Sequence, residues 1–332
     1  MPEPHTTLLL SPSEIRYEMY AYLIPDRVHV HRRGDKLCLS RCIETLLVKE
    51  EDGSQAVVNT CSNAPDGYER QKGECPSPVW ARRLRSAWGP HWDRNLEVVD
   101  LLARTAIIHI TDLRMIRWLH EMMAIPLMHP RIVSSLALAL THLQMTLRLP
   151  LIFYQLLECQ EDANDSKLEL AGAIDTWLQL PATLIRMKQL SKFCIWLDHD
   201  EPCSWSVVNE RALLAPITRL SGSRNLTISI VLPKLHPKLE SDDRHFISGS
   251  PISFQLYRRL RQRWHAREPT PACSSGIVHG PDFPFLIDGG EEFALMPLAD
   301  LEEEERTWWR DGTDVEELVR ETNDRWCTIS HI

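Results

Sequence analysis

Apolar residues along this chain recur in two patterns that alternate with each other. Some segments repeat apolar positions every three or four residues, which is typical of an amphipathic helix, and others are short apolar runs of strand length. The helical pattern covers residues 95–104, 113–123, 171–187 and 206–220, and the strand pattern covers 105–110, 133–141, 193–197 and 226–232. This alternation predicts an α/β fold, with α+β as a variant, in which short strands form a mainly parallel sheet. The strand spacing is too unequal for a leucine-rich repeat, although a degenerate relative of such an array stays open.

Residues 27–42 have the alternation of two strands around a two-residue turn at Gly34-Asp35, which predicts a β-hairpin. Val28 and Val30 would lie on one face. The opposite face would carry His29, His31, Cys38 and Cys42. These four side chains have the ligand types of a tetrahedral zinc site if the two strands bring them together. The simpler interpretation is a polar hairpin face, and we predict no metal ligand there.

Residues 10–23 combine the start signal of a helix with an apolar stripe. Ser11 serves as the N-cap, Pro12 occupies the first helical position, and Glu14 completes a capping box. The stripe consists of Ile15, Met19, Tyr22 and Leu23. A helix with such a face covers it against its own chain or against a partner.

The 332 residues, of which 43% are hydrophobic and 25% charged, have the composition of a globular protein with a substantial core. No secretory signal precedes the first helix, and residues 125–157 are too often interrupted by Pro, Arg and His to span a membrane. Nine cysteines without a disulfide-like spacing indicate reduced thiols. We therefore predict a cytoplasmic or nuclear protein that does not associate with membranes.

The net charge of −9 is concentrated near the carboxyl terminus. Residues 291–324 contain thirteen acids and three arginines, a net of −10, so the rest of the chain carries about +1. Arginines and aromatics are interleaved in residues 80–88 and 257–267, a combination that suits nucleic acid. The rest of the chain, with a net charge near +1, produces no broad positive field, so nucleic acid is not the favoured partner. We predict that 257–267 is a solvated face or docks the acidic residues 302–305.

Breaks in these patterns divide the chain into five parts. They are a helix at 8–26, the hairpin at 27–48, a loop or disordered insertion at 49–78, an α/β body at 79–266, and a Pro/Gly-rich connection with an acidic helical tail at 267–332. Thr313 and Glu316 form a second capping box, which predicts that a last helix starts at Thr313.

The charged run Asp198-His199-Asp200-Glu201 directly follows a predicted buried strand, where α/β proteins place ligand sites. Carboxylates beside a histidine can bind a metal or act as a general acid–base pair, and His245 would add a ligand from beyond the next strand. Charged residues at a strand end are more often a solvated turn, and no metal-ligand spacing is present. No nucleophile elbow or glycine-rich phosphate loop occurs either. We predict no catalytic residue, no metal and no cofactor.

Residues 10–23, LSPSEIRYEMYAYL, resemble the opening helix of an F-box, the module by which substrate adaptors dock onto the Skp1-type linker of ubiquitin ligases. Four further segments resemble uncharacterised fungal proteins that carry an F-box-like start. They are 196–214 (WLDHDEPCSWSVVNERALL), 232–237 (LPKLHP), 242–246 (DDRHF) and 257–264 (YRRLRQRW). The resemblance implies a docking helix whose contacts are made by Leu10, Pro12, Ile15, Met19 and Leu23.

These observations favour a protein-interaction protein over an enzyme. The leading hypothesis is an F-box-like adaptor that binds a Skp1-type linker protein and an unknown protein substrate. One alternative is a metal-dependent hydrolase built on Asp198, His199, Asp200 and His245. The other is a non-catalytic structural protein whose first helix packs on its own core.

Overall fold

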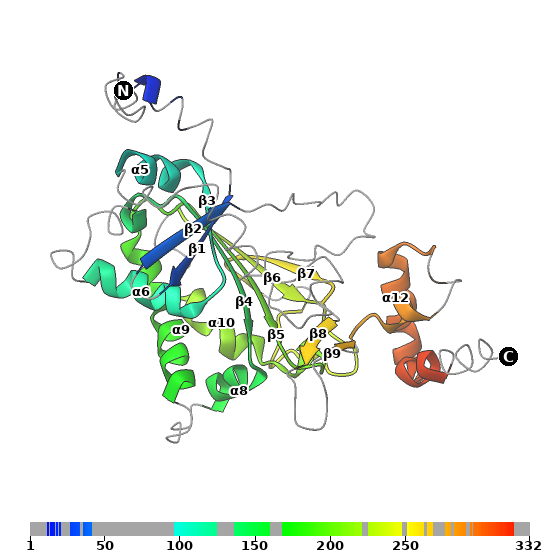
Figure 1. The fold of residues 1–332 in the computed structure, drawn as a ribbon. Helices are drawn as coiled ribbons and strands as arrows, with labels where there is room; N and C mark the ends of the chain where they lie inside the picture. The colour runs from blue at the N-terminus through cyan, green and yellow to red at the C-terminus, as the bar shows by residue number, and fades with distance from the viewer. Residues whose placement is uncertain are drawn as a thin grey trace.

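The computed structural model describes residues 12, 14–16, 18, 20, 27–33, 36–41, 96–124, 136–159, 168–220, 225–247, 251–261, 264–267, 276–279, 282–289, 293 and 295–321. Its main element is a seven-stranded sheet in the order β2-β1-β3-β4-β5-β6-β7 (Figure 1). The strands are β1 (Arg27–Arg33), β2 (Lys36–Arg41), β3 (Ile107–Ile110), β4 (His142–Leu149), β5 (Lys192–His199), β6 (Thr227–Pro233) and β7 (Gln255–Arg259). The helices beside them are α5 (Leu96–Thr105), α6 (Leu113–Ala124), α8 (Leu151–Cys159), α9 (Leu168–Arg186) and α10 (Glu210–Thr218). The predicted α/β fold is confirmed, because every pair of neighbours except β1 and β2 is parallel.

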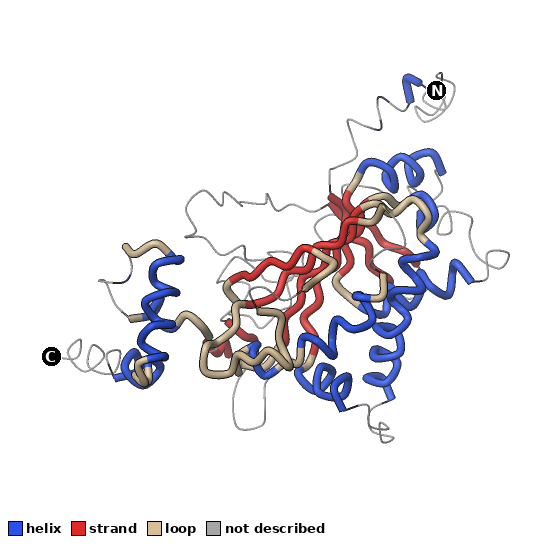
Figure 2. Tube along the Cα trace, turned by 180° about the vertical axis from the view of Figure 1, so that it is seen from behind, coloured by secondary structure: helices blue, strands red, loops and turns tan. Residues whose placement is uncertain are grey.

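The parallel part of the sheet is wound in one direction only. From β4 to β7, each strand lies beside the strand that precedes it in the sequence and parallel to it. Right-handed crossovers between sequential parallel strands place their helices on the same face. Figures 1 and 2 show α5, α6, α8, α9 and α10 together on one side of the sheet. This winding is that of a strand–helix array in which each unit packs on the next.

The face of the sheet that meets these helices forms the core. Alternate residues of the strands are buried there. They are Val28, Val30, Ile108, Ile110, Leu143, Met145, Leu147, Phe193, Ile195, Leu197, Ile228, Ile230 and Leu232. In α9, Trp177 is fully buried and its indole N–H donates to the Leu213 carbonyl of α10 at 2.9 Å. Each large apolar side chain buried in this way contributes about 1.5–3 kcal/mol, so this face is the main source of stability.

The opposite face carries a row of polar side chains, one from each parallel strand. The row consists of His29, His109, Gln144, Cys194, Ser229 and Gln255, which occupy matched register positions. The rings of His29 and His109 lie 4.5 Å apart, and Nε2 of His109 is 2.7 Å from the Thr146 hydroxyl. Burial, followed by the charges of His29 and Arg27, holds the pKa of His109 well below its ordinary value. His109 is therefore a neutral hydrogen-bonding member of this row.

The predicted hairpin is confirmed, and it forms one edge of the same sheet. β1 and β2 are antiparallel, with His31 opposite Cys38, and β1 pairs in parallel with β3. The side chains of His31 and Cys38, and the whole of Cys42, lie outside the described part of the chain. His29 makes its ring contact with His109 of β3. The zinc arrangement that the spacing left open gains no support from these contacts.

One predicted strand, at 133–141, is wrong. Residues 136–139 form a helical turn, and the strand follows it as β4. Leu136 and Leu140 are 2% and 1% exposed, whereas Leu138 between them is 46% exposed. Burial of residues four apart is helical spacing, although the alternation of leucine with alanine has the period of a strand. The sequence pattern also fails to predict α8, which follows β4 directly.

The other predicted elements of the sheet and its helices are confirmed with shifted ends. These elements are β3, β5, β6, α5, α6 and α9. β5 extends two residues beyond its predicted end at residue 197. α10 begins at Glu210 instead of residue 206, because the short 3-10 helix η3 (Trp205–Val207) precedes it. The first of these shifts changes the interpretation of the charged run that follows.

The carboxyl-terminal part adds a two-stranded sheet and a small helical unit. β8 (Trp264–Arg267) and β9 (Gly276–His279) are antiparallel, and η4 (Phe285–Asp288) precedes α12 (Leu298–Arg310) and a helix at 315–321. A second, smaller core joins the helices. It consists of Phe285, Leu286, Leu301, Val315 and Val319. Glu305, which is fully buried, accepts a hydrogen bond from the Leu286 backbone N–H at 2.9 Å and so fixes α12 to η4.

The predicted last helix is present but begins one residue later than its capping pattern indicates. Asp314, rather than Thr313, caps it, because Oδ1 of Asp314 accepts from the Glu317 backbone N–H at 3.1 Å. The sequence pattern does not predict α12, whose run of acids interrupts the apolar spacing. Residues 49–78, predicted as a loop, lie outside the described ranges. Among the helices that are described, none is long and apolar enough to cross a membrane.

The correction at 133–141 gives a direct stability test. Leu136→Ala and Leu140→Ala should each lower the free energy of unfolding by about 2–5 kcal/mol, because both side chains are buried. Leu138→Ala should change it by no more than about 0.5 kcal/mol, because Leu138 is half exposed. Urea unfolding measures all three. Equal destabilisation by the three variants would instead indicate the strand, in which all three leucines share one face.

Candidate functional site

The candidate site lies where β5, β6 and β7 end. Because β5 extends to His199, Asp198 and His199 are part of the strand and both are fully buried. The expectation of a solvated turn is therefore wrong for these two residues, and only Asp200 and Glu201 are exposed. The structure explains the burial by a cation that comes from beyond β7, Arg261, which is 3% exposed.

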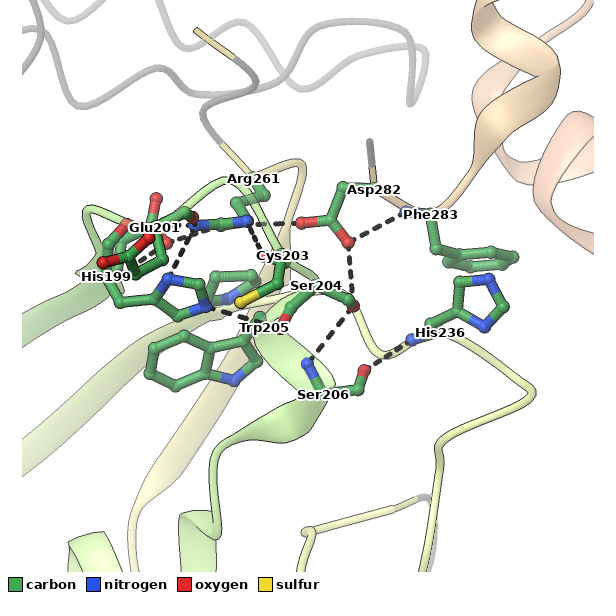
Figure 3. Close-up of polar contacts among 12 residues, drawn as sticks. His199, Glu201, Cys203, Ser204, Trp205, Ser206, His236, Arg261, Asp282 and Phe283 are labelled. Atoms are coloured by element: carbon green, nitrogen blue, oxygen red, sulfur yellow. Dashed lines mark hydrogen bonds and ion pairs between the residues drawn. The ribbon is translucent and has the colours of Figure 1, made fainter. Parts of the chain in front are cut away.

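Arg261 is the centre of a buried polar cluster (Figure 3). Its Nε lies 2.8 Å from Oδ1 of Asp198 and 3.6 Å from Oδ2 of Asp282. Its Nη2 donates to the carbonyl of His199 at 3.0 Å and to that of Glu201. Its Nη1 donates to the carbonyl of Cys203. The guanidinium thus joins the end of β5, the loop that follows it and the start of the carboxyl-terminal unit.

His199 is held as a neutral imidazole within this cluster. Arg261 Nη2 is only a donor, so Nδ1 of His199, 2.9 Å away, accepts, and the ring proton lies on Nε2 facing the Ser204 carbonyl at 3.4 Å. Trp205 stacks on the ring at 5.9 Å. Burial and then the charge of Arg261 lower the pKa of His199 to about 3. A base this weak is poorly matched to proton transfer near neutral pH.

Asp282 gives the cluster a second carboxylate for one guanidinium. Its Oδ1 accepts from the Ser204 hydroxyl at 3.2 Å and from the Phe283 backbone N–H at 2.9 Å. Oδ2 of Asp282 and Oδ2 of Asp198 are buried and make no hydrogen bond among the described residues. Burial raises the pKa of Asp282 to about 7 and also raises the pKa of Asp198, against the opposing charge of Arg261. Two like charges at one site favour a proton on one of them.

A second buried ion pair lies next to the first and is built around Glu210. The carboxylate accepts from the Trp205 indole N–H at 2.8 Å and from the Phe246 backbone N–H at 3.1 Å. Arg258 of β7 makes a two-pronged ion pair with it, with Nη2 at 2.8 Å, and donates further to the Phe246 carbonyl at 2.6 Å. Asn209 caps α10 just ahead of Glu210 by accepting from the Ala212 N–H at 3.0 Å. The start of α10 is thereby fixed to β7.

The histidines of the neighbouring loop are also held by hydrogen bonds. In His245, Nδ1 accepts from the Ser241 N–H at 3.0 Å, and Nε2 lies 3.0 Å from the Ser206 carbonyl. His236 accepts from the Lys238 N–H through Nδ1 at 3.1 Å. No group of three His, Cys, Asp or Glu residues with metal-binding geometry occurs in the described ranges. The geometry therefore gives no support to the hydrolase alternative, in which His245 would join Asp198 and His199.

Residues 196–214 and 257–264, which are far apart in the sequence, meet at this place. Asp198 and Glu210 come from the first segment, and their cationic partners Arg261 and Arg258 come from the last. The prediction that 257–267 forms a solvated face or docks residues 302–305 is wrong for these two arginines, which pair with buried acids of the body. Residues 80–88 lie outside the described part of the structure.

The carboxyl-terminal unit is attached to the body by contacts around His236. The ring of His236 lies 4.8 Å from the Trp309 ring and 5.4 Å from the Phe285 ring. Arg306 of α12 lies over the Phe283 ring at 4.7 Å and pairs with Glu240 at 2.8 Å. Burial, followed by the charge of Lys238, lowers the pKa of His236 to about 4, so the ring is an uncharged packing partner.

Comparison with known proteins finds no family model, no curated protein and no solved structure that matches this chain. The class of protein is therefore defined by architecture alone. It is a singly wound α/β protein in which buried ion pairs close the carboxyl edge of the sheet and attach a small helical unit. The clusters fix the positions of the loops around them.

Asp282 predicts a specific pH dependence of stability. Its pKa is raised from an ordinary 3.8 to about 7, so the folded state binds this proton more tightly than the unfolded state. The contribution of this proton to the free energy of unfolding is at most about 4 kcal/mol. It is complete below about pH 4 and is lost as the pH rises through 7. In Asp282→Asn this loss should disappear. Urea unfolding between pH 4.5 and 8.5 measures the slope, with the exposed Asp200→Asn as control. If stability changes with pH in Asp282→Asn as it does in the wild type, the loss of stability near pH 7 does not come from Asp282.

The Glu210 pair predicts a large cost for removing one partner. Glu210→Ala leaves Arg258 without its carboxylate in a largely buried place, and should lower the free energy of unfolding by about 3–5 kcal/mol. Glu158→Ala removes a more exposed carboxylate from Arg244 and should cost about 1 kcal/mol or less. Thermal and urea unfolding of the two variants make the comparison. Similar costs would mean that burial does not set the strength of the Glu210 pair.

Proposed function

We propose that this chain is a protein-interaction protein, an F-box-like adaptor whose first helix docks onto a Skp1-type linker while its body binds a protein substrate. The observation that carries the proposal is the exposure of the first helix. Ile15 is 48% exposed, whereas Tyr20 is 5% exposed. One side of this helix is covered, and an apolar residue of the docking set remains available.

The local geometry of the helix supports this role. The Arg16 N–H donates to the Pro12 carbonyl at 3.1 Å, so Pro12 lies next to the start of this helix. Ile15 and Tyr20 are five residues apart and therefore about 140° apart around the helix axis. Met19 follows Ile15 by four residues and would extend the exposed face. Leu10, Met19 and Leu23 lie outside the described residues, so their part in docking stays a prediction.

The body supports binding rather than catalysis. The residues that the sequence offers for chemistry, Asp198 and His199, are buried and engaged by Arg261. Of the described cysteines, Cys159, Cys194 and Cys203 are all free thiols. Free thiols fit a reducing compartment, and we place the proposed adaptor in the cytoplasm or nucleus.

Co-purification with a Skp1-type protein tests the docking helix. Wild-type chain should hold the partner, and the double variant Ile15→Asp, Met19→Asp should lose it. Burying one large apolar side chain is worth about 1.5–3 kcal/mol, so each aspartate should weaken binding about tenfold or more.

The matched control is Ile185→Asp on α9, where the side chain is 43% exposed, similar to Ile15. It should keep the complex. Urea unfolding of both variants separates a lost contact from a lost fold. Persistence of the complex in the double variant, or no complex with the wild type, would refute the adaptor role.

A further inference from the structure

A cleft of about 620 Å³ lies between the end of the sheet and α12. Its apolar lining comes from β7 and from the chain between β6 and β7. The residues are Leu235, Phe246, Ile247, Ile252 and Leu256. Ile252 is 38% exposed, so part of this apolar surface faces solvent. The volume is within the range of sites that hold a drug-sized ligand or a few side chains of a peptide.

The cations that line the cleft are already neutralised within the protein. Lys234 pairs with Glu302 of α12, and the two side chains are 17% and 20% exposed. Arg258 pairs with Glu210, and Arg306 pairs with Glu240 at 2.8 Å. The Lys234–Glu302 and Arg306–Glu240 pairs fix α12 as one wall of the cleft. They also leave its interior without a free positive charge among the lining residues.

Two segments that line the cleft, in contrast, carry exposed acids in or beside the lining. In one segment, Glu240 lines the cleft and the exposed Asp242 and Asp243 follow it. The other segment, α12, contains five acids and two arginines, a net charge of −3. Glu303 lines the cleft with its side chain 71% exposed, and its partner Arg310 is itself 65% exposed. Charges this exposed set a local negative potential more than they stabilise the fold.

The neighbouring strand favours an extended occupant. β7 is the last strand in the order of the described sheet, and its residues Leu256 and Arg258 line the cleft. A peptide lying along a sheet edge presents alternate side chains to the same side. One of them can therefore reach the apolar lining while its neighbours stay near the exposed acids.

We propose that this cleft binds an extended, basic segment of a partner protein. A large apolar side chain of the segment packs on Ile252 and Leu256, and lysines or arginines beside it face the exposed acids of residues 240–243 and of α12. The inference rests on the proposed function, because it identifies the surface that would take the protein substrate. It predicts a substrate segment of opposite charge to α12.

The test uses the full chain and a library of ten-residue peptides with leucine fixed at the centre and all other positions varied. Peptides retained by the immobilised protein should be enriched in Lys and Arg beside the leucine. Binding of one selected, fluorescein-labelled peptide is then measured by fluorescence polarisation. Its Kd should rise with added salt, because the acids beside the cleft are exposed.

Two variants and two controls complete the test. Ile252→Asp and Glu303→Lys should each raise the Kd at least tenfold. Ile185→Asp on α9 and Glu121→Lys on α6, which have comparable exposure away from the cleft, should leave it unchanged. No enrichment, enrichment of acidic residues, or equal effects in variants and controls would overturn the inference.

The outcome is independent of the docking helix. Loss of the Skp1-type complex together with normal peptide selection would reject the adaptor role and keep the cleft. A retained complex with no peptide selection would keep the adaptor role and reject the cleft as a binding site.

Discussion

The arrangement of the carboxyl edge of the sheet depends on the burial of one guanidinium, that of Arg261. A buried cation loses its hydration, and the cost is offset only when carboxylates and carbonyls take every direction in which it donates. Here the acceptors come from β5, from residues 199–203 and from Asp282. The same charge therefore fixes the loop after β5, the chain after β7 and the start of the carboxyl-terminal unit. None of these can move alone without leaving a buried donor or carboxylate without a partner.

The direction of winding determines where a ligand can bind. In doubly wound sheets a crevice opens where the strand order reverses, and the charged run after β5 would lie in such a crevice. The order from β3 to β7 has no reversal, so neighbouring loops close on each other instead of separating. Among the described residues, a cleft is lined by β7, the last strand of this order, and by α12. The polar network and the cleft are thus two results of the same sequential order.

Much of the fold follows from local patterns, whereas the site does not. β3, β5 and β6 and the helices α5, α6 and α9 follow from spacing within a single segment. The 136–140 segment misleads because its leucines fit both periods, and only packing shows that Leu138 is exposed. The pairs of Arg258 with Glu210 and of Arg261 with Asp282 join distant segments, which no local pattern encodes. One local signal existed: Asp198 continues the buried strand, so its charge required a cation from elsewhere.

The acids of this chain fall into two groups with different physical roles. Asp198, Glu210, Asp282 and Glu305 are buried, and each is bonded to a cation or a backbone N–H that it holds in place. The exposed acids beside the cleft are screened within about 8 Å at physiological salt and add little to stability. Their field nevertheless acts at the distance over which a partner first approaches, where it selects for opposite charge. In the proposed binding of a basic segment, the exposed Glu303 would act through this field, whereas Glu305 of the same helix acts in folding.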